Sequence, residues 1–328
     1  MAGGGNILCV IGTRPEAIKL APVISAAREC PNLSVSVCLT GQHREMVDSV
    51  LEFFKIKPDH DLDIMRPGQD LTDVTTAALS RLRDLLREKR PDCVLVQGDT
   101  TSVMASSLAA FYAKVPVAHV EAGLRTGDVH SPWPEEMNRR IATLAASLHF
   151  CPTESAADNL LSEGVPHSRI AVTGNTVIDA LLCAKQHIEL SDKLRSALEN
   201  RFDFLNKQRR LILVTGHRRE NFGQRLQSIC TALAQLAARS DVQIVYPVHL
   251  NPNVRDTVQR ELSKLANVHL LPPQDYVPFV FLMNRADIIL TDSGGVQEEA
   301  PSLGKPVLVM RDTTERPEGL SAGTVKVV

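Results

Sequence analysis

The sequence shows no excess of one charge, no long apolar run and no leader-like start. Its 36 basic and 38 acidic side chains leave a formal net charge of −2, which gives no electrostatic reason to expect binding to nucleic acid or to an anionic membrane. A membrane-spanning helix needs about 20 consecutive apolar residues, and no segment provides them. The first residues, MAGGGN, lack the charged and apolar regions of a signal peptide. We therefore expect a cytoplasmic protein without a nucleic-acid or membrane partner.

Paired cysteines are missing as well. The seven cysteines are scattered, and no two of them have the spacing of a zinc or redox pair. Cys9, Cys38 and Cys93 lie within apolar, strand-like runs, where buried reduced thiols are the expected state. No combination of cysteines and histidines has the spacing of a zinc site.

Several motifs with defined chemistry are absent or weak. The G-x-G-x-x-G pattern of dinucleotide-binding folds does not occur, which counts against NAD. The G-x-S-x-G elbow of serine hydrolases does not occur either. Asp61-Leu62-Asp63 has the D-x-D pattern that many metal-dependent sugar transferases use, but it lies in a polar stretch without a flanking strand. We therefore expect no metal and no redox cofactor.

The sequence does contain a regular alternation of short apolar runs and longer amphipathic ones. The apolar runs predict strands, and segments such as residues 15–29 and 80–89 have helical spacing. Strands that alternate with helices predict an α/β fold with doubly wound parallel sheets. The predicted strands are residues 6–11, 33–39, 93–96, 115–120, 148–151, 170–173, 211–215, 242–246, 268–271, 288–290, 307–310 and the final TVKVV.

The length of 328 residues is too great for one compact core and predicts two domains. Strand signals are missing from a polar, helical stretch in the middle of the chain, which predicts the boundary. We expect a Rossmann-like domain over residues 1–178, a helical connection over 179–207 and a second Rossmann-like domain over 208–328. Two such domains predict an interdomain cleft for a ligand. A covering helix would normally follow the last strand, so we expect a truncated C-terminus.

Three carboxylates stand where a parallel sheet would direct them at a ligand. Asp99 and Glu121 each follow a predicted strand, and Glu135 follows on a loop that Pro132 and Pro134 bracket. The carboxyl ends of parallel strands border the ligand-binding crevice of open α/β sheets. Clustered acids at that place suit proton transfer better than packing, so we predict that these three are catalytic.

A glycine turn in the first half predicts an anion site. Gly12 opens a strand-to-helix turn, Arg14 adds a planar donor, and Lys19 adds a point charge about one helical turn later. The alternative is that both cations are solvated side chains on an ordinary turn.

A second glycine turn predicts a similar site in the other half. Ser293, Gly294 and Gly295 follow a predicted strand, and the glycines expose backbone N–H groups to a phosphate. Glu299 can accept hydrogen bonds from ribose hydroxyls. An ordinary capping box at Ser293 is an equally good interpretation. His217, in TGHRREN, follows another strand and is a candidate for proton transfer, and His249, in YPVHLNP, is a weaker one.

With these residues the chain resembles the UDP-N-acetylglucosamine 2-epimerases of the bacterial non-hydrolysing type. The matching segments follow the family's order from one end of the chain to the other. They are GTRPEAIKLAPV, TGQHREM, QGDTTSVMAS, HVEAGLRTGD, SPWPEEMNRR, VTGNTVID, TGHRREN, YPVHLNPNV, LTDSGGVQEEAPSLGKPVLVMRDTTERPE and AGTVKVV. The resemblance implies a GT-B-like fold, a homodimer through the first domain, and no metal or cofactor.

The resemblance also implies a reaction, the reversible inversion at carbon 2 that converts UDP-N-acetylglucosamine to UDP-N-acetylmannosamine. In this family UDP is eliminated to leave 2-acetamidoglucal and then adds back. The product would supply N-acetylmannosamine for bacterial surface polysaccharide. The match implies that Asp99, Glu121 and Glu135 handle protons and that His217 is the active-site histidine. Which acid removes the proton and which returns it stays open.

The nucleotide contacts are likewise implied by the match. They are Arg14, Lys19, Gln274, Phe279, Ser293, Gly294, Gly295, Glu299 and Arg316. Gln274 and Phe279 lie in PPQDYVPFV, which we interpret as a loop that holds the uracil. Some members bind a second substrate molecule beside the active site, and Gln42 and His249 match that allosteric set. Glu45 and Gly68 stand where such members have a glutamine and an arginine.

Three other functions fit parts of the sequence. A hydrolysing epimerase would use the same intermediate and release UDP with free N-acetylmannosamine. A GT-B glycosyltransferase would need an acceptor site, for which no motif is visible. A nucleotide-sugar sensor would have no use for three acids beside an anionic ligand.

Overall fold

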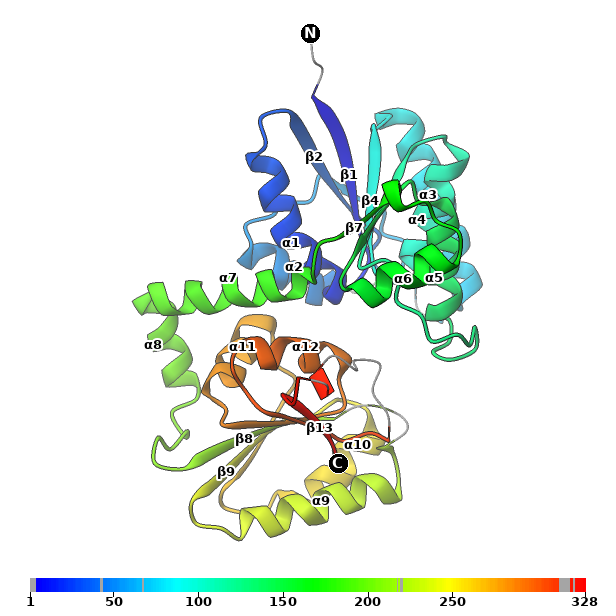
Figure 1. The fold of residues 1–328 in the computed structure, drawn as a ribbon. Helices are drawn as coiled ribbons and strands as arrows, with labels where there is room; N and C mark the ends of the chain where they lie inside the picture. The colour runs from blue at the N-terminus through cyan, green and yellow to red at the C-terminus, as the bar shows by residue number, and fades with distance from the viewer. Residues whose placement is uncertain are drawn as a thin grey trace. The chain divides into compact units, whose positions relative to one another are not determined.

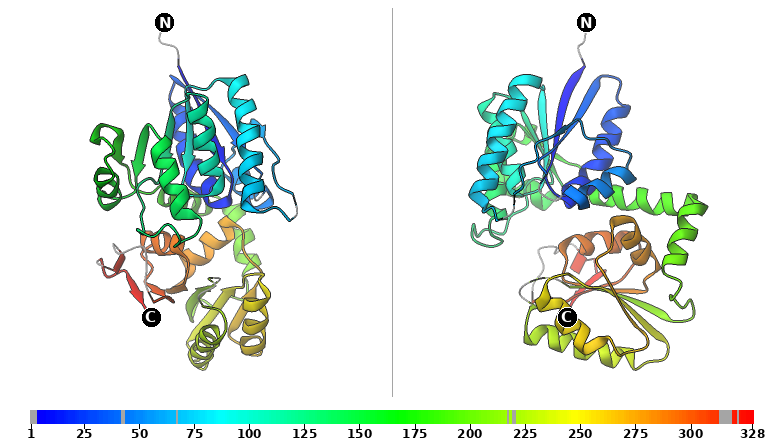
Figure 2. Two further views of the ribbon diagram at one scale, coloured as in Figure 1. Left: turned by 90° about the vertical axis from the view of Figure 1, so that its right-hand side faces the viewer. Right: turned by 180° about the vertical axis from the view of Figure 1, so that it is seen from behind.

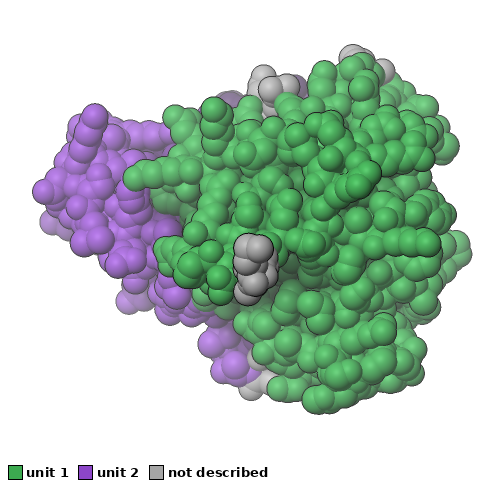
Figure 3. Space-filling model, turned by 90° about the horizontal axis from the view of Figure 1, so that it is seen from above, with its two compact units in different colours: residues 1–180 green, residues 181–328 purple. Residues whose placement is uncertain are grey.

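The computed structural model describes residues 4–41, 44–66, 68–216, 218, 221–312, 319–320 and 322–328, with the backbone alone for residues 44–46. The chain forms two compact units, Met1–Ala180 and Leu181–Val328, which Figure 3 shows in two colours. Each unit contains a parallel sheet with helices packed on it. The prediction of an α/β fold with two Rossmann-like sheets is therefore confirmed.

Unit 1, residues 1–180, is built on a seven-stranded parallel sheet in the order β3-β2-β1-β4-β5-β6-β7 over its described residues (Figure 1). The end of β1 and the whole of β5 are buried, as expected for parallel strands that helices cover on both faces. The strands are β1 (Gly5–Ile11), β2 (Leu33–Leu39), β3 (His60–Asp61), β4 (Cys93–Gln97), β5 (Val117–Val120), β6 (Leu148–Cys151) and β7 (Ile170–Val172).

Helices cover both faces of this sheet (Figure 2). α1 packs beside α2, and α3, α4 and α5 form a second group of neighbours. The helices are α1 (Arg14–Glu29), α2 (Arg44–Phe53), α3 (Leu71–Lys89), α4 (Thr101–Tyr112), α5 (Glu135–Ala145), α6 (Glu154–Ser162), the short 3₁₀ helix η1 (His167–Arg169), and α7 (Thr176–Leu190), which begins in unit 1 and ends in unit 2. Among the described residues, none of the helices has both the length and the apolar character to cross a membrane.

α3 shows how the sequence sets the length of a helix. Its buried residues, spaced mostly three or four apart, are Val74, Ala78, Leu82, Leu85 and Leu86. The sequence predicts a helix over residues 80–89 only, which is too short. The helix begins at Leu71 because Asp70 accepts a hydrogen bond from the Asp73 N–H (2.9 Å) and Asp73 accepts one from the Asp70 N–H (3.1 Å). This capping box satisfies donors that the first turn would otherwise leave without partners.

Unit 2, residues 181–328, repeats the same plan. Its described strands form a parallel sheet in the order β10-β9-β8-β11-β12-β13, which is the order of the first six strands of unit 1. α9 and α10 cover one face, and α11 and α12 cover the other (Figures 1 and 2). The elements are α8 (Asp192–Arg201), β8 (Arg210–Thr215), α9 (Gln224–Ala237), β9 (Val242–Pro247), α10 (Pro252–Leu262), β10 (Val268–Leu271), α11 (Tyr276–Arg285), β11 (Ile288–Thr291), α12 (Gly294–Ser302), β12 (Val307–Val309) and β13 (Val325–Val327).

The strand order reverses once in each sheet, between β1 and β4 in unit 1 and between β8 and β11 in unit 2. Open α/β sheets bind ligands outside the carboxyl ends of the strands at such a reversal. The turns there begin at Gly12 and Gly98 in unit 1 and at Gly216 and Asp292 in unit 2. In each unit, therefore, two turns that carry predicted site residues lie at the reversal point, the place where the strand order of its sheet reverses.

One part of the sequence interpretation is wrong. Asp61 was expected to lack a flanking strand, but it belongs to β3, and it pairs with Leu39 at the edge of the sheet. An edge strand has one partner and one open side, so it does not need the apolar run that marks a central strand. The cysteine prediction fares better, because Cys9 and Cys38 are buried free thiols and Cys93 is a half-buried one.

Candidate functional site

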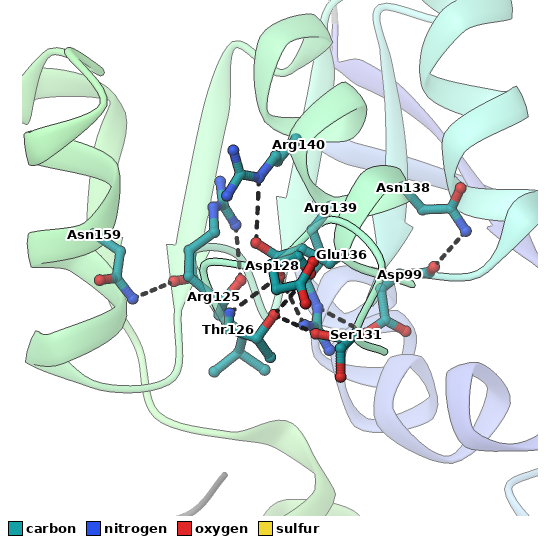
Figure 4. A network of polar contacts seen from close by, with 12 residues as sticks. Asp99, Arg125, Thr126, Asp128, Ser131, Glu136, Asn138, Arg139, Arg140 and Asn159 are labelled. Atoms are coloured by element: carbon teal, nitrogen blue, oxygen red, sulfur yellow. Dashed lines mark hydrogen bonds and ion pairs between the residues drawn. The ribbon is translucent and has the colours of Figure 1, made fainter. Parts of the chain in front are cut away.

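Asp99 lies in the turn between β4 and α4, and α5 holds it in place (Figure 4). Arg139 donates to the Asp99 Oδ2 from Nε (2.9 Å) and Nη2 (2.7 Å). Asn138 donates from Nδ2 to the backbone carbonyl of Asp99 (2.8 Å). Both the side chain and the main chain of Asp99 are therefore fixed by two consecutive residues of one helix.

Arg139 also contacts a second carboxylate, that of Glu136. Glu136 is completely buried and accepts hydrogen bonds from Arg139 Nη1 (3.1 Å), Arg140 Nε (3.2 Å) and the Thr126 N–H (3.2 Å). Burial raises the pKa of Glu136, but these hydrogen bonds outweigh it and hold the pKa below its usual value. The sequence interpretation missed Glu136 and Arg139, although their spacing of three residues predicts contact on one helix face.

Glu121 follows β5 and is the most constrained of the three predicted acids. Its backbone φ is +62°, a left-handed conformation that a residue other than glycine rarely adopts. Lys19 Nζ lies 2.7 Å from its Oε1 and 2.6 Å from its Oε2, Gln97 donates to Oε2, and Asn175 Nδ2 lies 3.4 Å from Oε1. Lys19, predicted to contact a phosphate, is thus paired with a predicted catalytic acid. Strain that the surroundings hold in place is typical of functional sites.

The sequence predicts a loop at Glu135, and this prediction is wrong. Glu135 is the first residue of α5. Pro134 precedes it as the N-cap residue. An acid in the first turn is favoured by the helix dipole, which explains why the helix begins there. The Glu135 side chain is half-buried and makes no hydrogen bond or ion pair with the described residues. It is therefore the predicted acid with a carboxylate available for a ligand.

His119 supports the turn that carries Asp99. It is buried in β5, and its Nε2 lies 2.7 Å from the carbonyl oxygen of Gly98. The carbonyl can only accept, so Nε2 carries the proton and Nδ1 does not. Burial lowers the pKa of His119 to about 4, so the ring is neutral at physiological pH.

The residues of unit 1 described so far meet at the carboxyl ends of β4 and β5. Gln97 at the end of β4 pairs with Val120 at the end of β5, so Asp99 and Glu121 follow neighbouring strands. Arg14 is half-buried at the start of α1. The N–H of Gly12 is already bound by the Glu16 carboxylate (2.5 Å), so the predicted anion site at this turn lacks that donor.

Unit 2 contains a helix N-terminus of a different kind. Ser293 is the N-cap residue of α12, but its side chain makes no capping bond, so the alternative of a capping box is wrong. Its own N–H donates to Thr291 Oγ1 (3.0 Å). Gly294 and Gly295 form the first turn, and Glu299 is buried in the second. Because no side chain caps the N–H groups of the first turn, these groups can bind an anion.

A cation lies beside this helix. A Cβ added to Gly294 would be 3.9 Å from Arg218 Nη2, and Arg218 Nε is buried with no hydrogen-bond partner among the described residues. Asp292, fully buried, holds the Arg218 backbone N–H at 2.9 Å and Asn221 Nδ2 at 3.0 Å. The sequence interpretation missed Arg218, which follows the predicted His217. The start of α12 therefore combines open N–H donors with a guanidinium.

Gln274 and Phe279 are also in unit 2. Gln274 is buried, accepts a hydrogen bond from Arg201 Nη2 (2.9 Å) and donates to the Pro272 carbonyl (2.6 Å). Phe279 lies in α11 and is half-buried, so the predicted uracil loop is a helix from Tyr276 onward. The local pattern hides this helix because Pro278 occurs near its start, where proline is tolerated.

Some predicted residues need only brief mention. His217, Arg316 and Gln42 lie outside the described residues. His249 follows β9, is exposed, and accepts a hydrogen bond at Nδ1 from the Asn251 N–H (3.1 Å). Across the part of the chain that the structure describes, no group of three or more histidine, cysteine, aspartate or glutamate side chains is arranged to hold a metal ion.

Comparison with known proteins gives one consistent result. The family model described as UDP-N-acetylglucosamine 2-epimerase matches residues 25–328. The Escherichia coli (strain K12) protein named UDP-N-acetylglucosamine 2-epimerase is 59% identical over 324 residues, which are 98% of this chain and 86% of that protein.

Solved structures of such proteins have the same fold. The UDP-GlcNAc 2-epimerase from Neisseria meningitidis, bound to UDP-GlcNAc, is 53% identical with a TM-score of 0.93 over 98% of this chain and 87% of that chain. The Methanocaldococcus jannaschii UDP-GlcNAc 2-epimerase, in complex with UDP-GlcNAc and UDP, is 33% identical with a TM-score of 0.83 over 98% of this chain and 88% of that chain. The GT-B-like architecture of this chain follows from that likeness.

Proposed function

Since the chain belongs to the UDP-N-acetylglucosamine 2-epimerase family, we propose that it interconverts UDP-N-acetylglucosamine and UDP-N-acetylmannosamine by the non-hydrolysing route. One observation carries the proposal. Asp99 and Glu121 are each fixed by a cation at the ends of neighbouring strands, while Glu135 has no partner among the described residues. Such a set suits the removal of a proton and its return.

The proposed chemistry has two steps. A carboxylate takes the proton from carbon 2, the bond between carbon 1 and the UDP oxygen breaks with its electron pair going to UDP, and 2-acetamidoglucal forms. UDP then adds to carbon 1 while an acid returns a proton to the opposite face of carbon 2. The division of these roles among Asp99, Glu121 and Glu135 stays open. The cations at two of the acids, Arg139 at Asp99 and Lys19 at Glu121, orient them, and a general base must be positioned in this way.

Departure of UDP needs stabilisation of its growing negative charge. We assign this to unit 2, where the first-turn N–H groups of α12 and the Arg218 guanidinium are available. The contact set that we propose for UDP is Arg14, Lys19, Gln274, Phe279, Ser293, Gly294, Gly295, Glu299 and Arg316, with His217 near the diphosphate. Solved relatives bound to UDP-GlcNAc or UDP support a UDP-sugar ligand. Proton chemistry would then belong to residues 1–178, and UDP recognition mainly to residues 208–328, with Arg14 and Lys19 as the proposed contacts from the first part of the chain.

Incubation in heavy water tests the proton transfer. We expect UDP-N-acetylglucosamine recovered from the reaction to carry deuterium at carbon 2, because the abstracted proton exchanges before it returns. Asp99→Asn should bind UDP normally and lose more than about 10²-fold in turnover, the typical contribution of a general acid or base. Recovered substrate without deuterium, while product still accumulates, would contradict the mechanism.

Product analysis tests the non-hydrolysing assignment. We expect an equilibrium mixture of the two UDP-sugars in which free UDP stays far below the product. Free UDP and N-acetylmannosamine formed in equal amounts would instead identify a hydrolysing epimerase. Transfer of the sugar to an added acceptor would identify a glycosyltransferase.

We further propose that the enzyme is a homodimer that works in the cytoplasm and supplies N-acetylmannosamine for surface polysaccharide. Support for the dimer comes from α4 and α5, neighbouring helices that expose large apolar side chains. Phe111 is 59% exposed, Tyr112 73% and Leu144 84%. Apolar groups gathered on one face commonly mark a contact between subunits.

A further inference from the structure

Glu16 is a buried carboxylate to which the reaction so far assigns no role. It lies in the first turn of α1, is 2% exposed, and accepts three hydrogen bonds. The donors are the Gly12 N–H (2.5 Å), Thr13 Oγ1 (3.0 Å) and Thr100 Oγ1 (2.7 Å). Gly12 and Thr13 belong to the turn after β1, and Thr100 belongs to the turn after β4. One side chain therefore joins both turns at the reversal point of unit 1.

The turn that binds Glu16 is tightly packed against α4. A Cβ added to Gly12 would lie 2.4 Å from Ser102 Oγ. Ser102 of α4 therefore approaches this turn more closely than a residue other than glycine at position 12 would permit. Ser102 Oγ in turn lies 3.0 Å from Thr40 Oγ1, at the end of β2. The ends of three strands are thus held together around one acid.

Opposing effects act on the negative charge of Glu16, and burial, which disfavours the charge, is the largest of them. Glu16 lies at the N-terminus of α1 and is hydrogen-bonded to the N-cap residue of α4, and both helix dipoles stabilise an anion there. Burial raises the pKa of Glu16 to about 7, while the hydrogen bonds from Gly12, Thr100 and Thr13 act to lower it. Where a Rossmann-like turn often holds the phosphate of a ligand, this turn holds a carboxylate of its own.

Thr100 connects Glu16 to the candidate site. It directly follows Asp99, donates to Glu16 and accepts from the Val103 N–H (3.3 Å). Its hydroxyl is therefore bonded on both sides, which fixes the backbone that leaves Asp99. Asn138 and Arg139 fix Asp99 from the opposite element, α5. Removal of the bond to Glu16 would leave Asp99 held from one side only.

We propose that Glu16 is a positioning residue that orients Asp99 through Thr100 for the proton transfer at carbon 2. The inference rests on the proposed epimerase reaction. A displacement of a reacting group by about 1 Å can lower a rate by about 10²-fold. Loss of this orientation should therefore act on turnover and leave UDP binding, which the inference assigns to other residues, unchanged.

Glu16→Gln is the central test variant. Glutamine keeps the shape but replaces one acceptor oxygen by an amide group, which faces an N–H or O–H donor. We expect kcat to fall by about 10- to 100-fold, with KM for UDP-N-acetylglucosamine and Kd for UDP within about threefold of wild type. Thr100→Val, which lacks the hydroxyl, should show the same loss, and Thr100→Ser should retain most of the turnover.

Asp70→Ala is the matched control. It removes the capping box of α3, so it should lower the urea midpoint of unfolding without a change in kcat. Wild-type kcat in folded Glu16→Gln and Thr100→Val would overturn the inference. An equal fall of kcat in Asp70→Ala would also overturn it. A rise in KM without a fall in kcat in the Glu16 and Thr100 variants would overturn it as well. Should Glu16→Gln fail to fold, the Thr100 variants decide. An inactive wild-type enzyme would contradict the proposed reaction instead.

Discussion

The Arg139 side chain contacts two carboxylates at once, those of Asp99 and Glu136. Arg139 and Asn138 were not predicted as site residues, since Arg139 meets an acid that is 40 positions away in the sequence. Lys19 and Glu121 are 102 positions apart, so their pairing was not predicted either. The positions of Asp99 and Glu121 could be predicted because each follows an apolar strand directly. A partner across the sheet leaves no such local pattern.

Replacement of Arg139 by glutamine tests this arrangement. Arg139→Gln leaves Asp99 without its cation and the buried Glu136 with one cation fewer, so we expect the free energy of unfolding to fall by about 3 kcal/mol and kcat to fall with it. Arg140→Gln is the control, since Arg140 contacts Glu136 but not Asp99. Urea unfolding and steady-state kinetics measure both effects. Equal loss of turnover in the two variants would contradict a specific role at Asp99.

His119 gives the protein a defined response to acid. Its pKa is about 4 in the folded protein against about 6.5 when unfolded, because burial and then the nearby Arg125 and Arg139 disfavour the cation, while Glu121 and the Gly98 bond favour it. The contribution to stability is complete above pH 6.5 and is lost as the pH falls toward 4. The loss for this shift is about 3 kcal/mol.

His119→Gln removes that titration while its amide can still donate to Gly98. The unfolding free energy of the variant, measured from pH 7 to pH 4, should fall less steeply than that of the wild type. The buried His149, whose pKa burial also lowers to about 4, keeps part of the slope in both proteins. His130→Gln, at an exposed position, should show the wild-type slope. An unchanged slope in His119→Gln would refute the assignment.

At the level of helices and strands, the N-termini of α1 and α12 differ in the source of the anion, which is a side chain of the protein at α1 and the proposed ligand at α12. At the start of α1, the Glu16 carboxylate accepts a hydrogen bond from the Gly12 N–H. At the start of α12, the Ser293 side chain makes no capping bond, and Gly294 and Gly295 have no side chain to cover the N–H groups. A Cβ at Gly294 meets no atom closer than 3.9 Å, so Gly294→Ala should fold with wild-type stability or slightly more, since alanine is the better helix former.

The same Cβ would stand where a phosphate approaches the N–H groups. We therefore expect Gly294→Ala to weaken UDP binding by about tenfold, which corresponds to about 1.4 kcal/mol, and to leave uridine binding unchanged. Isothermal titration calorimetry with both ligands separates the two effects. Equal loss for uridine would place the contact away from the diphosphate.

The predicted element bounds agree with the structure where the signal is local. The strands predicted at residues 33–39, 148–151 and 268–271 have those bounds in β2, β6 and β10. α3 and β3 were predicted incompletely or not at all, because a capping box and a single edge partner determine them. The start of α5 was read as a loop because two prolines precede Glu135.

For the whole molecule, the sequence predicted the architecture better than the interactions. The alternation of strands and helices predicted two parallel sheets, and the described strands of unit 2 have the order of the first six strands of unit 1 although no sequence repeat relates them. What the alternation does not predict is which unit supplies acids and which supplies anion donors, because both depend on single side chains at equivalent turns.

The exposed apolar face of α4 and α5 predicts the oligomeric state. Tyr112→Asp with Leu144→Asp should convert the proposed dimer to a monomer, because two charges would be desolvated in the contact. Leu190→Asp is the control, since Leu190 is similarly exposed but lies at the end of α7. Light scattering coupled to size exclusion measures the mass. A wild-type protein with the mass of one chain would contradict the dimer.

The open N-terminus of α12 has a consequence for how cleanly the enzyme would turn over. In the proposed reaction, UDP and 2-acetamidoglucal separate within each turnover, which then ends either in their recombination or in the escape of one of them. In this proposed reaction, the N–H groups of Gly294 and Gly295 and the guanidinium of Arg218 would lengthen the residence time of UDP and would thereby set the fraction of turnovers that end in leakage. Weaker binding of UDP would give faster release of products and more leakage, so this helix N-terminus would govern the commitment of the intermediate as well as the affinity for UDP.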